Sequence, residues 1–139
     1  MRVPSDNSRT NYFRMNRSVK EAETEQLIEA IVEGIQRKKG LDLLKIDLTK
    51  INHTECKYFI ICHGNSTTQV DAIAHSVEDT VEELINQKVW HKDGYRNSIW
   101  ILLDYADIMV HVFQKESRKH YDLENLWADA HIEYIKEDN

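Results

Sequence analysis

Two short apolar segments, joined by four residues, constrain the fold of this chain more than any other feature. Residues 99–103 (IWILL) and 108–113 (IMVHVF) are rich in strand-forming residues, and the linking residues 104–107 (DYAD) are polar at both ends. This arrangement predicts an antiparallel β-hairpin. Neither segment alternates cleanly between apolar and polar residues, which predicts central strands covered on both faces.

The second strand of this hairpin is expected to divide its side chains between the two faces of the sheet, because the side chains of a strand alternate. His111 would then lie among large apolar side chains. Two roles are open for it: a half-buried histidine whose hydrogen bonds are satisfied, or a residue that contacts a partner. Tyr105, at the tip, has nothing to pack against unless a partner or a second loop covers it. One face would hold Ile108, Val110 and Val112, and the other Met109, His111 and Phe113.

The rest of the chain adds helices and strands of an α/β domain. Apolar residues at helical spacing predict helices over residues 18–39 and 66–85. Ser18 with Glu21 and Ser66 with Gln69 have the spacing of capping boxes, and Gly40 is the expected stop of the first helix. Strands are expected at residues 43–48, 57–62 and 89–91, with a charged turn at 115–121 and one or two helical turns at 122–127 capped by Asp122.

A chain of 139 residues is the length of one domain. The order of elements predicts helices packed on a mixed sheet. Residues 1–17 lack periodicity and contain the single proline, so we expect a disordered tail before a domain over residues 18–139.

The charge is unevenly distributed along the chain. The net charge is −6, yet residues 1–20 carry five basic side chains and one acidic one, which leaves 13 basic and 23 acidic residues elsewhere. An acidic domain is poorly suited to binding nucleic-acid phosphates and better suited to binding a basic protein. Arginines of the tail, at positions 9, 14 and 17, leave room for a minor contact with nucleic-acid phosphate.

Cysteine content and hydropathy indicate the expected environment. Cys56 and Cys62 lie six residues apart on or near one extended segment, too far for a disulfide. Reduced thiols and the lack of a signal peptide favour the cytoplasm. No apolar segment approaches the length needed to span a bilayer.

The hairpin and the segment after it resemble the ribosomal silencing factor family, also called the Iojap family. The resemblance is carried by WILLDYADIMVHVF and YDLENLW, and it extends upstream through KIDL and YFIICHGNSTTQV to cover about Glu25 to Ala130. Ala106 departs from the family pattern, which has glycine at the tip, so this turn is expected to be strained or of another type.

The resemblance implies a fold and a function. The fold would be a single α/β domain, related to nucleotidyltransferases but without their catalytic carboxylates. The function would be binding to the large ribosomal subunit through the ribosomal protein called L-fourteen, which would block joining of the small subunit and repress translation. The family also includes dimers, so a homodimer is left open, and we expect no cofactor and no membrane contact.

On this reading the hairpin supplies the docking face. Asp104 and Asp107 would pair with basic side chains of the partner, and Tyr105 would be an apolar anchor. The full set of expected partner-binding residues is Trp100, Asp104, Tyr105, Asp107, His111 and Phe113.

An enzyme and a zinc-binding protein are two alternatives to a docking protein. A third alternative, an assembly factor, would use the same docking face. The turn Gly64–Ser66 before a helix resembles the phosphate-binding turn of a nucleotidyltransferase. That chemistry requires paired carboxylates for a divalent metal, and the sequence contains no D-x-D. A zinc site from His53, Cys56, Cys62 and His63 is disfavoured because Cys62 and His63 would point to opposite sides of a strand. A factor in large-subunit assembly would use the same face as a silencing factor.

Overall fold

The structure, a computed structural model, describes residues 6–51 and 55–136, and for residues 6–18 it describes only the helical course of the backbone. The first half of the chain forms one long helix, two strands and a second helix. The second half adds three strands, two short helices and a final strand. In chain order these are α1 (Asp6–Arg37), β1 (Leu41–Asp47), β2 (Tyr58–Gly64), α2 (Thr67–Ile85), β3 (His91–Asp93), β4 (Trp100–Asp104), β5 (Ile108–Gln114), α3 (Lys115–Tyr121), α4 (Leu123–Leu126) and β6 (His131–Tyr134).

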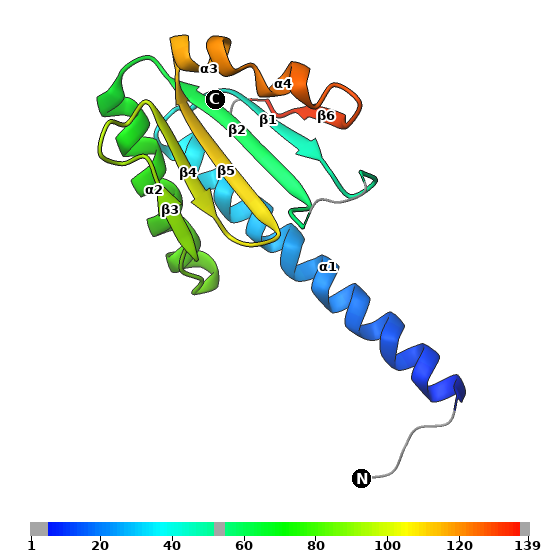
Figure 1. Cartoon of the computed structure of the whole chain (residues 1–139). Helices are drawn as coiled ribbons and strands as arrows, with labels where there is room; N and C mark the ends of the chain where they lie inside the picture. The colour runs from blue at the N-terminus through cyan, green and yellow to red at the C-terminus, as the bar shows by residue number, and fades with distance from the viewer. Residues whose placement is uncertain (1–5, 52–54, 137–139) are drawn as a thin grey trace.

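The described strands form one mixed six-stranded sheet in the order β3-β4-β5-β2-β1-β6 (Figure 1). Strands β2 and β5 are parallel, and every other neighbouring pair is antiparallel. The predicted α/β domain with a mixed sheet is confirmed, and so is the interior position of both hairpin strands.

The predicted antiparallel hairpin is confirmed as β4 and β5. Trp100 is opposite Phe113 at the open end, and Asp104 is opposite Met109 beside the tip. The two faces of β5 also divide as expected. Ile108, Val110 and Val112 belong to the main core, whereas Phe113 belongs to a second cluster on the other side of the sheet.

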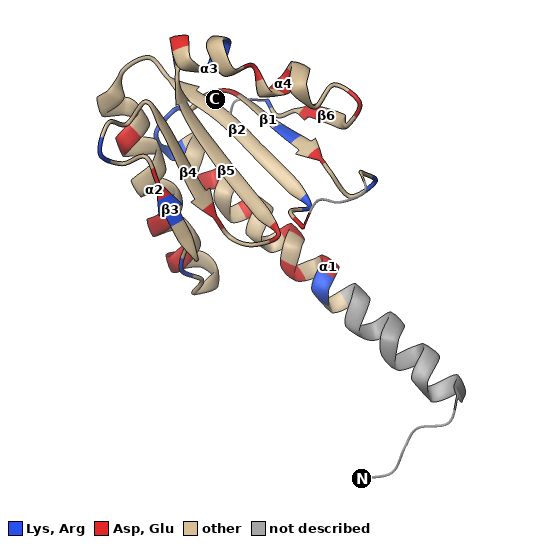
Figure 2. Cartoon of the chain, viewed as in Figure 1, with Lys and Arg blue, Asp and Glu red and all other residues tan. Residues whose placement is uncertain are grey.

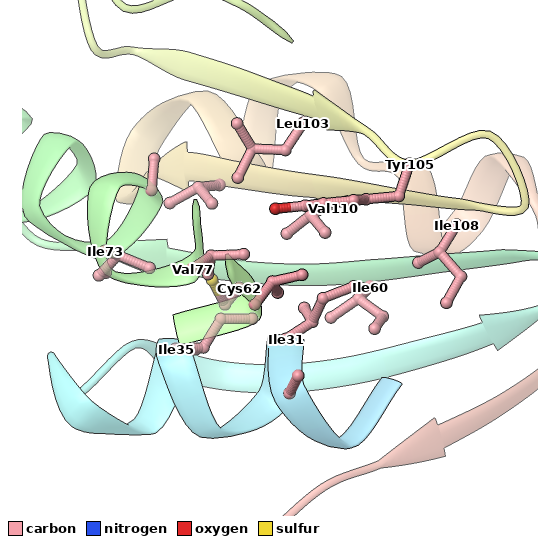
Figure 3. Packing of buried hydrophobic residues seen from close by; sticks show 14 of the residues in the cluster. Ile31, Ile35, Ile60, Cys62, Ile73, Val77, Leu103, Tyr105, Ile108 and Val110 are labelled. Atoms are coloured by element: carbon pink, nitrogen blue, oxygen red, sulfur yellow. The ribbon is translucent and has the colours of Figure 1, made fainter. Parts of the chain in front are cut away.

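The first face of the sheet packs against α1 and α2, and the main core lies between them (Figures 1 and 3). The two helices approach closely at Gly34, where an added Cβ would lie 2.7 Å from the Cα of Val77. At the same crossing the Ser76 hydroxyl donates to the Gly34 carbonyl oxygen over 2.7 Å. Ile31, Ile35 and Ile73 are fully buried in this layer. Each such side chain contributes about 1.5–3 kcal/mol to folding.

The second face is covered in part by α3 and α4, which pack near the end of β5 (Figure 1). The prediction of a charged turn at residues 115–121 is wrong, because this segment is the helix α3. The Gln114 side chain caps α3 by accepting from the Glu116 N–H over 3.2 Å. Strand β6 was not predicted, and β3 begins two residues later than expected.

The helix ends confirm some of the predicted caps. Ser66 is the N-cap of α2, and its hydroxyl oxygen accepts from the Gln69 N–H over 3.1 Å. Asp122 occupies the N-cap position of α4 but makes no capping hydrogen bond with its side chain. Helix α1 ends before Gly40, and the left-handed residue after it is Lys39, with a φ of 57°.

The start of α1 corrects the sequence-based boundary. The helix begins at Asp6, so Ser18 lies inside it and does not cap it. Residues 1–5 of the expected disordered tail lie outside the described part of the chain, and the division into residues 1–17 and 18–139 stays a prediction. Within the described residues, no helix has both the length and the apolar character needed to cross a bilayer.

Candidate functional site

The second face of the sheet is the candidate site, because its β4–β5 part is less well covered than the rest. Leu102 is opposite His111, and Met109 is opposite Asp104 and beside Phe59 of β2. Directly paired residues share a face. Leu102, Met109 and Phe59 are each only half-buried, although they lie in the middle of the sheet. We call the half-buried apolar set on this side the open face, and it comprises Phe59, Trp100, Leu102 and Met109.

Trp100 is held in one orientation at the end of the open face. Its indole Nε1–H donates to Nδ1 of His111 over 3.1 Å. Its ring stacks on Phe113, with centroids 4.9 Å apart, and lies 4.7 Å from the ring of Tyr121 on α3. A tryptophan that is half-buried and already fixed loses little conformational freedom when a partner covers it. Trp100 therefore has the properties of an interface anchor.

His111 acts on the open face through Trp100 and not by direct contact. Its side chain is 5% exposed, and burial lowers its pKa to about 4, so the ring is neutral at physiological pH. Because Nδ1 accepts the indole proton, the ring proton is on Nε2, which has no hydrogen-bond partner within the described residues. The ring makes an edge contact with Phe59, with centroids 4.7 Å apart. His111 is thus a core residue that positions Trp100.

Phe113 is likewise a support. It is 1% exposed and belongs to the cluster formed with Ile61 and Leu123. Its ring stacks beneath Trp100, so it stabilises the position of that side chain. In this arrangement it has no surface to offer a partner.

Tyr105 is buried in the main core and is not exposed at the hairpin tip. It is 3% exposed, and Figure 3 shows its ring extending over Val110 into the main core. The expectation that Tyr105 projects from the tip as an anchor is therefore wrong. The physical reason is alternation: Ile101, Leu103 and Tyr105 all face the main core, and this period of two continues past the end of β4.

Asp104 and Asp107 build the tip of the hairpin. Oδ1 of Asp104 accepts from the Ala106 N–H over 2.7 Å, and Ala106 has a φ of 71°. This left-handed residue confirms that the tip is strained where the family pattern has glycine. The Asp107 carboxylate lies 3.9 Å from the Lys57 ammonium, and both side chains are partly exposed. Both aspartates thus have structural roles and remain reachable from solvent.

The parts of a nucleotidyltransferase site are not brought together. The turn at Gly64 precedes α2 at the end of β2 that pairs with Gln114, whereas Asp107 precedes the other end, at Ile108. Seven residues of strand separate these ends by roughly 20 Å. Glu124 is bound instead to Arg118, at 2.8 Å. Asp107 therefore lies far from this turn, and Glu124 is held in an ion pair.

The cysteine and histidine side chains of the candidate zinc site also lie apart. Cys62 is buried in the main core, where burial raises the pKa of its thiol to about 12. His63 lies on the other face, and a guanidinium N–H of Arg118 donates to its Nδ1 over 2.9 Å. His53 lies outside the described residues. Among those that are described, no cluster of three or more His, Cys, Asp or Glu side chains could hold a metal ion.

Sequence reasoning missed three members of the open face. Phe59, Leu102 and Met109 were treated as strand residues without a role. The signal that identifies them is the register between neighbouring strands, which places them on the same face of the sheet as His111 and Trp100. Pairing across a sheet is a tertiary property, so no single segment of sequence reveals this shared face.

Comparisons with known proteins agree with this architecture. Residues 21–139 match the family model described as "Ribosomal silencing factor during starvation". The chain is 36% identical over 106 residues to the ribosomal silencing factor RsfS of Halalkalibacterium halodurans, covering 76% of this chain and 89% of that one. It is 43% identical over 93 residues to the RsfS of Bacillus subtilis, covering 67% and 77%.

Solved structures show the same fold. A crystal structure of a protein from Chromobacterium violaceum superposes with a TM-score of 0.70 at 29% identity, covering 75% of this chain and 85% of that one. One from Bacillus halodurans gives 0.67 at 32% identity, covering 81% and 98%.

The fold and the open face define a small α/β protein whose distinctive surface is a partly uncovered apolar sheet face. The chain belongs to the ribosomal silencing factor family.

Proposed function

We propose that this chain binds the large ribosomal subunit through ribosomal protein L-fourteen and that the bound chain blocks joining of the small subunit. Translation would fall because subunits held apart cannot initiate. The observation that supports this best is the open face, an apolar surface held in a fixed shape by the hydrogen bond from Trp100 to His111. A steric block requires a rigid domain and sufficient affinity, and it requires no chemistry.

The structure revises which side chains we assign to the contact. Trp100, Leu102 and Met109 are the proposed apolar anchors, because each is half-buried and on the same side of the sheet. His111 and Phe113 are positioning residues beneath Trp100. Central aromatic anchors of this kind carry most of the binding energy in protein interfaces.

Charge favours a basic partner at the tip end of this face. Asp104 lies at the end of β4, and Asp107 lies next to it in the hairpin tip. Figure 2 shows acidic segments at the hairpin tip and along the neighbouring part of α1. Opposite charges around an apolar centre increase association rates and fix the orientation of docking.

The proposal is tested by sedimentation with purified large subunits. Met109→Glu places a carboxylate on the open face and should abolish co-sedimentation, because the charge would be desolvated on binding. Leu84→Glu is the matched control, because Leu84 is an exposed apolar residue of α2, which packs on the other side of the sheet. Equal binding by both variants and the unmodified chain would show that the open face is not the docking surface.

Alternative roles lead to different measurements. A large-subunit assembly factor would use the same face but would bind maturing particles in preference to finished subunits. A nucleotide-binding enzyme would show heat of binding with nucleoside triphosphates and magnesium, where we expect none. Action in the cytoplasm, a contact of the N-terminal arginines with ribosomal RNA and a homodimer remain predictions.

A further inference from the structure

A pocket of about 660 Å³ lies beside the open face, between the β3–β4 loop and α3. It shares Trp100 with the open face, but its other walls have no part in the docking proposed above. Tyr121 of α3 lies across from the loop that follows β3. The side chains that matter here are those of Tyr95, Arg96, Asn97, Ile99, Trp100 and Tyr121.

Aromatic rings form one wall of this pocket. The Tyr121 and Trp100 rings lie 4.7 Å apart and are tilted by 43°. Tyr121 is 50% exposed, and Ile99 beside it is 44% exposed, so apolar surface faces the pocket and solvent. A partly exposed aromatic wall is the kind of surface on which an unpaired nucleobase stacks.

The lining of the pocket carries two basic side chains and one acidic one, in a chain whose body is acidic. These are Lys92, Arg96 and Asp93. Figure 2 shows basic segments on β3 and in the loop after it, and both basic and acidic segments on α3. This sign disfavours a basic protein at the pocket and favours a polyanion.

Two polar side chains of the pocket lining, those of Arg96 and Asn97, are available to bind a ligand, whereas their charged neighbours are already paired. Lys92 is bound to Glu78 at 3.1 Å, and Oδ1 of Asp93 accepts from the Gly94 N–H. Arg96 and Asn97 are exposed and make no side-chain hydrogen bond or ion pair with the described part of the chain. A guanidinium can pair with the phosphate of a nucleotide, and an amide can hydrogen-bond to the edge of its base. Here both groups line the same pocket as the exposed rings.

The loop that carries Arg96 and Asn97 has a fixed shape. The Ser98 N–H donates to the Gly94 carbonyl oxygen over 3.0 Å, and the Ser98 hydroxyl donates to the Tyr95 carbonyl oxygen over 3.2 Å. The Tyr95 hydroxyl donates to the Glu78 carboxylate of α2, which ties the loop to the helix layer. The pocket therefore exists before any ligand arrives.

We infer that this pocket takes an unpaired nucleotide of RNA, with the base stacked on Tyr121 and Trp100 and the phosphate held by Arg96. The contact would be a second point of attachment beside the open face. It rests on the proposed function only for where the RNA comes from, because the ribosomal subunit supplies both protein and RNA. The pocket itself is testable without ribosomes.

The direct test uses NMR on the full ¹⁵N-labelled chain, titrated at low salt with a single-stranded hexaribonucleotide. Saturable shifts are expected at the Trp100 indole N–H, the Asn97 side-chain amide and the backbone amides of residues 94–99. Arg96→Glu should weaken binding at least tenfold. Lys88→Glu is the control for overall charge, since Lys88 lies in the same basic segment but does not line the pocket, and it should change affinity less than threefold.

Three results would overturn the inference. The first is an absence of shifts at millimolar oligonucleotide. The second is the same shifts with inorganic phosphate alone. The third is an equal loss of affinity in Lys88→Glu and Arg96→Glu, which would indicate only diffuse attraction.

A second measurement separates this site from the open face. Arg96→Glu should weaken binding to the large subunit while leaving binding to the isolated ribosomal protein unchanged. If Arg96→Glu weakens binding to the isolated protein equally, the pocket takes protein and the inference is wrong. If the unmodified chain fails to bind the isolated protein, the proposed function fails, while the oligonucleotide titration still decides the pocket.

Discussion

At the scale of single residues, His111 illustrates how a polar group serves a binding surface from beneath it. The neutral ring accepts the Trp100 indole proton, and its own burial keeps it neutral. A charged imidazolium could not accept that proton, because both of its nitrogens would be donors. The shape of the open face is therefore linked to the protonation state of a group that a partner does not contact.

This linkage predicts a pH dependence of stability. Because burial lowers the pKa of His111 to about 4, the unfolded chain, with an ordinary pKa near 6.5, binds more protons on acidification. The stabilisation is fully present above pH 6.5 and is lost as the pH falls toward 4. Between pH 7 and 5 the unmodified chain should lose about 2 kcal/mol more than His111→Asn in urea unfolding.

The control for this measurement is His91→Asn, at an exposed position on the edge strand β3. It should retain the pH dependence of the unmodified chain. A His111→Asn variant with the same slope as the unmodified chain would contradict the account of the neutral ring.

Tyr105 gives a second prediction at this scale. Its hydroxyl is buried without a hydrogen-bond partner among the described residues, while its ring fills the main core. Tyr105→Phe should therefore leave stability unchanged or raise it by up to about 1 kcal/mol. Tyr105→Ala should lower it by about 3–5 kcal/mol, because a large cavity remains.

Thermal or urea unfolding measures both Tyr105 variants, and sedimentation with large subunits measures their binding. Tyr105→Phe should bind large subunits as the unmodified chain does. Loss of binding in a stably folded Tyr105→Phe variant would assign the Tyr105 hydroxyl to the interface and contradict this account.

At the scale of elements, the sequence predicted best those segments whose own pattern settles their structure. Helix α2 and the β4–β5 hairpin have strong periodicity or clear turns, and both formed as expected. Strand β6 was missed because four mostly exposed residues become a strand only through pairing with β1. The charged helix α3 was missed because it buries no residue of its own and is short. The same limitation left Tyr105 at an exposed tip in the prediction, since its burial depends on the alternation of β4 continuing into the tip.

Two turns lead to predictions of opposite sign. Gly94 has a φ of 93°, and an added Cβ would lie 1.9 Å from the Trp100 carbonyl oxygen. Gly94→Ala should lower the free energy of unfolding by about 1–3 kcal/mol and displace the β3–β4 loop. Ala106→Gly removes the strain of an alanine with a left-handed backbone at the hairpin tip. It should raise the free energy of unfolding by up to about 1 kcal/mol.

Urea unfolding of the two variants side by side provides an internal comparison, since each changes one methyl group at one turn. A loss of stability in Ala106→Gly would show that the tip is not strained. A neutral Gly94→Ala would show that the loop has room to move.

At the scale of the whole molecule, two helices cover the main core on one face of the sheet and two short helices cover the other face in part (Figure 1). The partial cover leaves the open face and, at its end, the basic pocket. Figure 2 shows acidic segments at the hairpin tip, and both basic and acidic segments on α3. The acidic tip suits a basic protein, whereas Arg96 in the pocket lining suits a phosphate.

The central claim is that the chain, docked on the large subunit through its open face, blocks joining of the small subunit. The direct test mixes purified large and small subunits with the chain and follows, in sucrose gradients, the fraction that joins. The unmodified chain should lower that fraction. Trp100→Ala should restore it, because loss of a central anchor costs about 2–4 kcal/mol of binding. Undiminished joining while the unmodified chain sediments with the large subunit would contradict the account.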